Sequence, residues 1–364
     1  MNVGIVFGGP SVEHDISIIT ASQIFASINR KKYNITLIYY SKDKKFYEVE
    51  NFDCAKNNLG DINLLREIPI NRLQGQKTGK FRKIKSIDCI ISAFHGKNTE
   101  GGELAGLFEV LDIPYSSNSI LGASLGQDKI TMKKVLKSDE INVLPYTYFS
   151  ASDFSKNEEK YLLKIREIGY PVIIKPSMLG SSIGIKIASN ENELKKGLNL
   201  AFKYDEYVIV EKALKHYREF NCAIFDDLLS EIEEVEVKND IFTFEDKYQN
   251  HESKHILPAI IDEKLKNEIY KMTVETSKSL RNESIARIDF LYDLEENKLF
   301  VNEINTIPGA LAYYLFESKG ILFDELLDRL ITHTMKRDYK KKKLINNFES
   351  SVLKGNNKGL KMKK

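Results

Sequence analysis

Val301-Asn302-Glu303-Ile304-Asn305 is the most informative stretch of the chain, because an apolar strand ends there in alternating polar residues. Residues two apart on a strand point to the same side, so Glu303 and Asn305 share one face. If the strand containing Arg287-Ile288-Asp289 is the antiparallel neighbour, Asp289 joins them there. Two carboxylates and an amide oxygen suit Mg²⁺ better than zinc. A solvated polar sheet face is the alternative for this stretch taken alone.

A Gly/Ser-rich loop follows a second apolar strand. Lys175 ends that strand, and Pro176-Ser177-Met178-Leu179-Gly180-Ser181-Ser182-Ile183-Gly184 comes next. Such a loop can place backbone N–H groups over phosphate oxygens, and Lys175 would add a positive charge. It is not a P-loop, because Gly-Lys-Ser/Thr is missing; the near match at residues 75–81 is one residue short and lacks the hydroxyl. A flexible hairpin is the alternative.

A third apolar strand, Val208-Ile209-Val210, ends in the charged pair Glu211-Lys212. The edge of such a strand can offer alternating backbone donors and acceptors to a purine. A strand capped by surface charges is the alternative.

Strand-like and helix-like stretches alternate along the chain, which indicates an α/β architecture. Residues 1–117 predict an open parallel sheet, with strands at Val3–Phe7, Ile35–Tyr40 and Ile87–Phe94. We expect a second unit over 118–211 and a third over 212–339, closed by a helix at Ile321–Lys336. The remaining segment, 340–364, predicts a loosely ordered basic tail, since residues 341–364 hold eight Lys and one Glu.

Composition excludes several classes of protein. The 54 basic and 52 acidic residues leave a net charge of +2, which argues against a nucleic-acid partner. No apolar run approaches the roughly 20 residues of a spanning helix, so no membrane contact is expected. The first residues read directly as a strand, so we expect no signal peptide. Three scattered cysteines suit a reducing compartment, and we expect a cytoplasmic protein.

The three stretches together resemble the ATP-grasp superfamily, and four N-terminal motifs narrow the resemblance. Gly8-Gly9-Pro10-Ser11-Val12-Glu13 resembles the Gly-Gly-x-Ser-x-Glu signature of the D-alanine–D-alanine ligase family. His95-Gly96, Ile113-Pro114-Tyr115 and Gln127-Asp128-Lys129 are similar to that family's next motifs, in the same order. The resemblance covers about residues 1–335. It implies a mixed α/β, three-domain ATP-grasp fold whose N-terminal domain is an open parallel sheet.

The resemblance also implies an activity. ATP phosphorylates the carboxylate of a first D-alanine, and the amine of a second attacks the acyl phosphate, which supplies a dipeptide for peptidoglycan precursors. It further implies a homodimer that binds two Mg²⁺ ions, or Mn²⁺ in their place.

Residue by residue, the resemblance implies contacts to ATP, to the metal ions, to the oxyanion and to each of the two substrates. ATP is held by Lys129, Lys175, Ser182, Glu211, Lys212, Leu214, Glu219 and Lys247. The metal ions are held by Asp289, Glu303 and Asn305. Arg287 and the Gly309 N–H stabilise the oxyanion, while Glu13, linked through Ser181 and Tyr248, binds the first substrate's ammonium group. His95 lies near the first substrate, and Tyr314 and Leu315 near the second.

The chain departs from the family pattern at two places. The usual Gly-Glu-Asp-Gly after His-Gly is reduced to Glu100. A Ser-Leu pair whose hydroxyl binds the second substrate's carboxylate is replaced by Tyr314-Leu315. Tyr248 matches ligases that use a second D-alanine. Tyr314 leaves the second substrate open, so the product could instead contain D-serine or D-lactate or be another dipeptide. A nucleotide-binding regulator without catalysis is an alternative of a different class, which the retained metal and oxyanion residues disfavour.

One further motif suggests an unrelated activity. His251-Glu252-Ser253-Lys254-His255 fits the zinc-protease pattern H-E-x-x-H. That chemistry needs a helix that presents both imidazoles on one face. The segment lies in a polar stretch, roughly residues 238–255, that predicts a loop. We therefore expect part of a lid and no zinc hydrolase.

Overall fold

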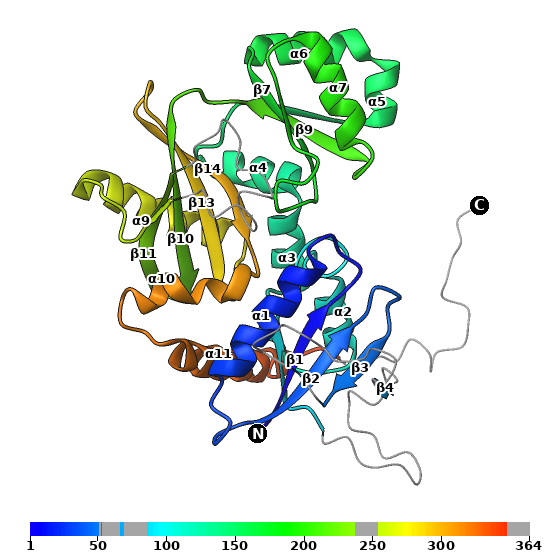
Figure 1. The fold of residues 1–364 in the computed structure, drawn as a ribbon, viewed down its shortest axis with the longest axis vertical. Coiled ribbons are helices and arrows are strands. Elements are labelled where there is room, and N and C mark those ends of the chain that lie inside the picture. Colours follow the sequence, from blue (N-terminus) through cyan, green and yellow to red (C-terminus); the bar gives the residue numbers. More distant parts are fainter. Residues whose placement is uncertain (51, 53–65, 69–85, 237–253, 348–364) are drawn as a thin grey trace, which may run out of the picture.

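The structure is a computed structural model that describes residues 1–50, 52, 66–68, 86–236 and 254–347 of the 364 (Figure 1). Three sheets organise this part of the chain. Buried apolar side chains form three clusters, one on each sheet. The mixed α/β class predicted from the alternating pattern is confirmed.

The N-terminal sheet has the strand order β4-β3-β2-β1-β5. Its centre is parallel, as predicted, with β1 (Asn2–Gly8) between β2 (Asn34–Tyr40) and β5 (Cys89–Ser92). Two short antiparallel strands that the sequence did not predict, β3 (Phe46–Val49) and β4 (Arg66–Ile68), extend it. Helices α1 (His14–Ser27) and α2 (Glu103–Val110) follow β1 and β5 in the chain.

The middle sheet has the order β6-β9-β7-β8 and its own small core. Its strands are β6 (Tyr146–Ser150), β7 (Val172–Pro176), β8 (Lys186–Ala188) and β9 (Tyr207–Lys212). Helices α5 (Ala151–Lys156), α6 (Glu158–Ile168) and α7 (Glu191–Ala201) belong to the same unit. The strands that end in Lys175 and Glu211 are therefore neighbours, paired antiparallel.

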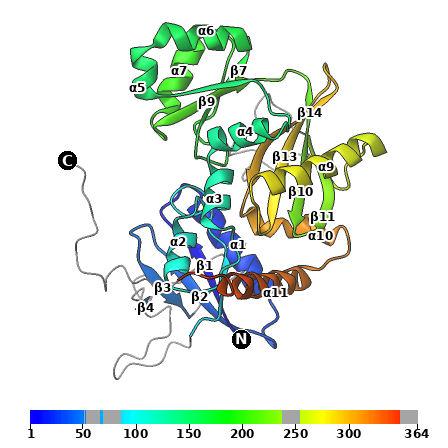
Figure 2. The ribbon, with the colours of Figure 1, turned by 180° about the vertical axis from the view of Figure 1, so that it is seen from behind.

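The C-terminal sheet is antiparallel, in the order β12-β11-β10-β13-β14. The strands are β10 (Tyr217–Phe225), β11 (Leu228–Glu236), β12 (Lys254–Ile256), β13 (Ala286–Asp293) and β14 (Lys298–Asn305). One face packs on α9 (Glu263–Ser279) and α4 (Lys129–Ser138), which α3 (Ile120–Gln127) precedes (Figure 2). The register pairs Asp289 with Glu303 and Arg287 with Asn305, which confirms the antiparallel neighbours and shared face expected from sequence.

Strand β12 corrects the prediction of a loop through His255. Lys254 and His255 pair with Glu236 and Val235, so the backbone there is held in the sheet. Residues 237–253 lie outside the described residues.

The last described helix returns to the N-terminal sheet. After β14, a turn (η3, Gly309–Ala312) and α10 (Tyr313–Glu317) lead to α11 (Phe323–Lys342). Buried leucines of α11, including Leu326 and Leu330, join the N-terminal core. The helix continues past the predicted end at Lys336, and Lys342 reaches Asp112 at 3.3 Å. Among the described helices, none combines the length and the apolar character that crossing a membrane requires.

We predict that α11 holds the N-terminal sheet to the rest of the molecule. Leu330 is 1% exposed within the N-terminal core, so Leu330→Ala should cost about 2–5 kcal/mol of unfolding free energy. Urea unfolding checks this against Ile345→Ala, a matched control at a side chain that is 91% exposed. Equal stabilities of the two variants would contradict the packing role of α11.

Candidate active site

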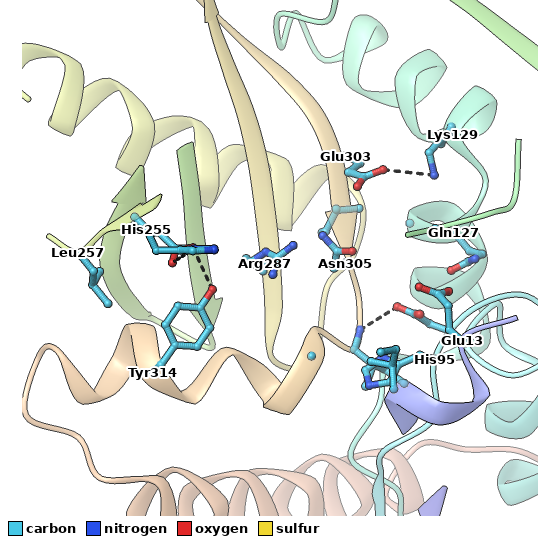
Figure 3. Close-up of a pocket in the computed structure, with 18 residues that line it drawn as sticks. Glu13, His95, Gln127, Lys129, His255, Leu257, Arg287, Glu303, Asn305 and Tyr314 are labelled. Atoms are coloured by element: carbon cyan, nitrogen blue, oxygen red, sulfur yellow. Dashed lines mark hydrogen bonds and ion pairs between the residues drawn. The ribbon is translucent and has the colours of Figure 1, made fainter. Parts of the chain in front are cut away.

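Two adjoining hollows lie where the sheets meet. The central cavity, of about 480 Å³, is lined from all parts of the chain by Glu13, His95, Glu100, Gln127, Lys129, Gly180, Glu233, His255, Arg287, Glu303, Asn305, Gly309 and Tyr314, with five apolar or glycine residues (Figure 3). The side cleft is lined by Leu144, Ile173, Lys175, Leu179, Gly180, Ser182, Ile185, Ile187, Glu211 to Leu214, Tyr217, Glu219, Leu291, Asn302 and Glu303. Gly180 and Glu303 line both, so the two hollows adjoin at these residues.

The face shared by β13 and β14 forms the floor of the central cavity. Arg287 donates from Nε and Nη2 to the two oxygens of Asp289 at 2.7 and 2.9 Å. Asn305 donates to Asp289 Oδ2 at 3.0 Å. Asp289 is thereby buried and satisfied, while Arg287, Glu303 and Asn305 line the cavity. The positive guanidinium is held in place by a forked contact that a lysine cannot reproduce.

Glu303 stands at the boundary of the two hollows, and Lys129 lies above it. Lys129 Nζ is 3.3 Å from Glu303 Oε2 and donates to Leu179 O at 2.7 Å. The carboxylates and amide of the shared face are hard oxygen donors of the kind Mg²⁺ prefers. In the part of the chain that the structure describes, no three His, Cys, Asp or Glu side chains are grouped as a metal cluster. The donor chemistry thus fits Mg²⁺, with Asp289 turned to Arg287.

Glu13 occupies one end of the cavity. It precedes α1 and accepts a hydrogen bond from Ser181 of the Gly/Ser loop. Burial raises the pKa of Glu13, and the Ser181 hydrogen bond opposes that rise. The loop approaches so closely that a Cβ on Gly180 would lie 2.9 Å from Glu13 Oε1. The predicted link between Glu13 and Ser181 is present; Tyr248, its third member, lies outside the described residues.

His95 lies beside Glu13 at the same end. Its Nε2 is 2.8 Å from Thr20 Oγ1, and the Thr20 hydroxyl accepts from the Ala310 N–H at 3.1 Å. Burial lowers the pKa of His95, so the ring is neutral near pH 7. This chain of contacts ties the N-terminal domain to the turn that carries Gly309, which also lines the cavity.

Glu100, identified from the sequence only as what is left of the family's Glu-Asp pair, positions the backbone around it. Its carboxylate accepts from Gly96 N at 3.0 Å, and from Thr306 Oγ1 and Ile307 N at 2.9 Å each. Burial raises the pKa of Glu100, and these three donors oppose the rise. Glu100 therefore joins the N-terminal domain to the end of β14. A single acidic residue suffices for this contact.

Lys133 was missed, although its spacing from Lys129 is one helical turn. The Lys133 side chain is fully buried, and its Nζ lies 3.3 Å from Glu211 Oε2. Lys175 Nζ also reaches that oxygen at 3.3 Å, and Asn302 Oδ1 at 2.9 Å. Burial lowers the pKa of Lys133. Burial alone would raise the pKa of Glu211, but Lys133 and Lys175 bring the pKa of this carboxyl below its ordinary value.

The side cleft collects the residues predicted to hold a nucleotide. Lys175, Ser182, Glu211, Lys212, Leu214 and Glu219 all line it. Aliphatic side chains such as Leu144, Ile185 and Leu291 supply apolar walls. Lys247 lies outside the described residues.

The end of the cavity opposite Glu13 contains two residues whose place sequence reasoning missed. Glu233 of β11 is 2% exposed and accepts from Tyr314 OH at 2.9 Å and Asn221 Nδ2 at 3.0 Å. His255 Nδ1 lies 2.8 Å from the other oxygen of Glu233. Tyr314 thus faces the cavity as predicted, whereas Leu315 is fully buried in the N-terminal core.

Comparisons with known proteins agree with this geometry. Two family descriptions match, "D-ala D-ala ligase N-terminus" over residues 2–118 and "D-ala D-ala ligase C-terminus" over residues 135–332. A D-alanine–D-alanine ligase of Thermosipho melanesiensis is 36% identical over 97% of this chain and 98% of its own. One of Staphylococcus epidermidis is 32% identical over 94% and 97%.

Solved structures share the fold. The VanG D-Ala:D-Ser ligase of Enterococcus faecalis superposes with a TM-score of 0.78 at 30% identity, over 92% of this chain and 99% of that one. The D-alanine–D-alanine ligase of Coxiella burnetii gives 0.79 at 25% identity, over 94% and 96%.

A lysine-lined cleft with apolar walls that adjoins a carboxylate- and arginine-lined cavity is the arrangement of an ATP-grasp ligase, and the solved relatives share this fold. The chain belongs to the D-alanine–D-alanine ligase family. It is accordingly an ATP-dependent ligase that acts on small molecules.

We predict that Glu100 positions the turn that carries Gly309. Glu100→Ala leaves the donors of Gly96, Thr306 and Ile307 without their acceptor, and the resulting shift should lower kcat roughly 10–100-fold. Ligase kinetics check this against Glu103→Ala, an exposed control three residues away. A kcat for Glu100→Ala equal to that of the control would contradict the assignment.

Proposed function

We propose that this protein joins two D-alanine molecules at the expense of ATP and so supplies the dipeptide for peptidoglycan precursors. The observation that carries the proposal is the junction of the two hollows at Glu303. ATP bound in the side cleft would direct its γ-phosphate past Glu303 into the central cavity. A carboxylate held there lies next to the phosphate that it attacks.

In the first step, Glu13 binds the ammonium group of the first D-alanine, with His95 beside it. A carboxylate oxygen of that substrate attacks the γ-phosphorus, the bond to the β-phosphate bridging oxygen breaks, and ADP leaves. Lys129 and Lys175 offset the charge of the phosphates, and Lys247 would reach the transferring group. Backbone at Lys212 and Leu214, with Glu211 and Glu219, would hold adenosine, and Ser182 lies in the loop over the phosphates.

In the second step, the free amine of the second D-alanine attacks the acyl carbon. Arg287 and the Gly309 N–H stabilise the oxyanion of the tetrahedral intermediate. The bond from carbon to the phosphate oxygen then breaks, so inorganic phosphate leaves with one oxygen of the original carboxylate. The lid linked through Ser181 and Tyr248 would exclude water, which otherwise hydrolyses the acyl phosphate.

Asp289, Glu303 and Asn305 would hold two Mg²⁺ ions, or Mn²⁺, which neutralise phosphate charge when bound. We further propose a cytoplasmic homodimer with domains at 1–117, 118–211 and 212–339 and a basic tail from 340. No nucleic acid or membrane takes part.

A second candidate differs only in the second substrate. Tyr314 stands where the family has the serine that binds the second substrate's carboxylate, and its hydroxyl donates to Glu233. The second substrate would then be D-serine, D-lactate or another amino acid. The VanG relative, whose name gives D-Ala:D-Ser ligase, carries this candidate.

Phosphate release tests the proposed activity. Purified protein with ATP and Mg²⁺ should release phosphate only when D-alanine is added, and mass spectrometry should identify D-alanyl-D-alanine. D-Serine or D-lactate in the product would favour the second candidate. Tight ATP binding with no turnover on any D-amino or D-hydroxy acid would reject both and indicate a regulator.

Arg287→Lys tests the oxyanion contact. Lysine keeps the charge but loses the forked geometry that Asp289 holds, so kcat should fall about 10²–10³-fold. The KM for ATP should change little, because Arg287 does not line the side cleft. Full activity of Arg287→Lys in the phosphate assay would remove Arg287 from the reaction.

A further inference from the structure

We propose that His255 binds the carboxylate of the second amino acid, and that Glu233 and Tyr314 position it. This rests on the proposed function, and it assigns to β12 the contact that the family's missing serine would have made.

Charge along the central cavity supports this assignment. Glu13 and His95 lie at one end, Arg287 lies in the middle, and Tyr314 and His255 lie at the other end (Figure 3). A dipeptide made in this cavity has its ammonium group at Glu13 and its new peptide bond near Arg287. Its carboxylate then falls at the far end. Of the described residues that line this end, His255 can supply a positive charge.

Tyr314 does not replace the serine as a donor. Its hydroxyl proton is directed to Glu233 Oε2 at 2.9 Å, so the phenol oxygen offers the cavity only lone pairs. Burial, partly opposed by Arg287, raises the pKa of Tyr314, so this proton stays on the phenol at neutral pH. A carboxylate placed against Tyr314 and Glu233 alone would meet acceptors and a negative charge.

His255 can supply the donor and the positive charge that a bound carboxylate needs at this end of the cavity. Glu233 is anionic, since its hydrogen bonds from His255 and Asn221 outweigh burial and keep its pKa below the ordinary value. The His255 nitrogen facing it, Nδ1, is therefore the donor at 2.8 Å. In the imidazolium form the opposite nitrogen, Nε2, also carries a proton and can donate to a carboxylate. The His255 ring is half exposed in the cavity wall, while the neighbouring Glu233 also lines the cavity but is almost fully buried.

The charge of His255 depends on its neighbours. The hydrogen bond to Glu233 raises the pKa of His255 and burial lowers it; Arg287 also lowers it, and Glu219 raises it. The net direction is upward, so the cation persists above the ordinary histidine pKa of about 6.5. Carboxylate binding should be present below the raised pKa and lost as the pH increases through it.

The test is a two-site kinetic measurement on full-length His255→Ala at saturating ATP. Loss of a charge-assisted hydrogen bond should raise the KM for the second D-alanine roughly 10–100-fold. The KM values for ATP and the first D-alanine should stay within about twofold. His216→Ala, at an exposed histidine outside both hollows, is the matched control and should behave as wild type.

Two further readouts separate carboxylate binding from a structural effect. In a mixture of D-alanine and D-alaninamide, wild type should strongly prefer the substrate with the free carboxylate, and His255→Ala should lose most of that preference. The KM of wild type for the second D-alanine should increase with pH through the His255 titration, and His255→Ala should lack this dependence. Tyr314→Phe should raise that KM only a few-fold and keep the preference.

Three results would overturn the inference while leaving the ligase activity intact. These are an unchanged KM in His255→Ala, an unchanged preference against D-alaninamide, or a loss in Tyr314→Phe as large as that in His255→Ala. Failure of wild type to form any D-alanyl product would instead reject the proposed function itself.

Discussion

The pairing of β13 with β14 is the constraint on which the site depends. Its register sets Asp289 opposite Glu303 and Arg287 opposite Asn305, so four polar groups share one face. A slip of one residue would turn two of them into the apolar core behind the sheet. The same pairing sets the direction in which the chain leaves β14, and hence the place of the turn with Gly309.

Buried charge at this face is stabilised by partners from other domains. Lys129 approaches Glu303 from α4, and Glu100 of the N-terminal domain fixes the end of β14. Gly126 of α3 comes so close that a Cβ there would lie 2.4 Å from the Thr306 side chain. Burial of an unpaired charge would cost several kcal/mol, so the domains must stay together for the site to keep its charges. Substrate binding and domain arrangement are therefore linked.

The sequence predicted the parts of this site that depend on local spacing. Alternation along a strand placed Glu303 and Asn305 on one face, and the Gly/Ser loop after Lys175 indicated a phosphate-binding segment; both segments line the hollows. The parallel centre of the N-terminal sheet also followed from alternating strands and helices. Lys133 could also have been predicted from the sequence, since it lies one helical turn from Lys129.

Other features depend on contacts that no local pattern encodes. Glu233 and His255 meet because β11 pairs with β12 across a long connection, and their register is a property of the folded sheet. For the same reason, the sequence pattern indicated His255 only as one histidine of a zinc-protease motif. The role of Glu100 required knowing that β14 ends against the N-terminal domain. The antiparallel strands β3 and β4 are short and carry little periodic signal.

The central claim is that a phosphoryl group passes from ATP in the side cleft to a substrate carboxylate in the central cavity, where the two hollows meet. D-Alanine labelled with ¹⁸O in its carboxylate tests this most directly, by mass spectrometry of the phosphate released during synthesis. The account predicts one ¹⁸O atom in each phosphate, because the acyl phosphate keeps a carboxylate oxygen when the amine displaces it. Unlabelled phosphate accompanying dipeptide formation would contradict the account.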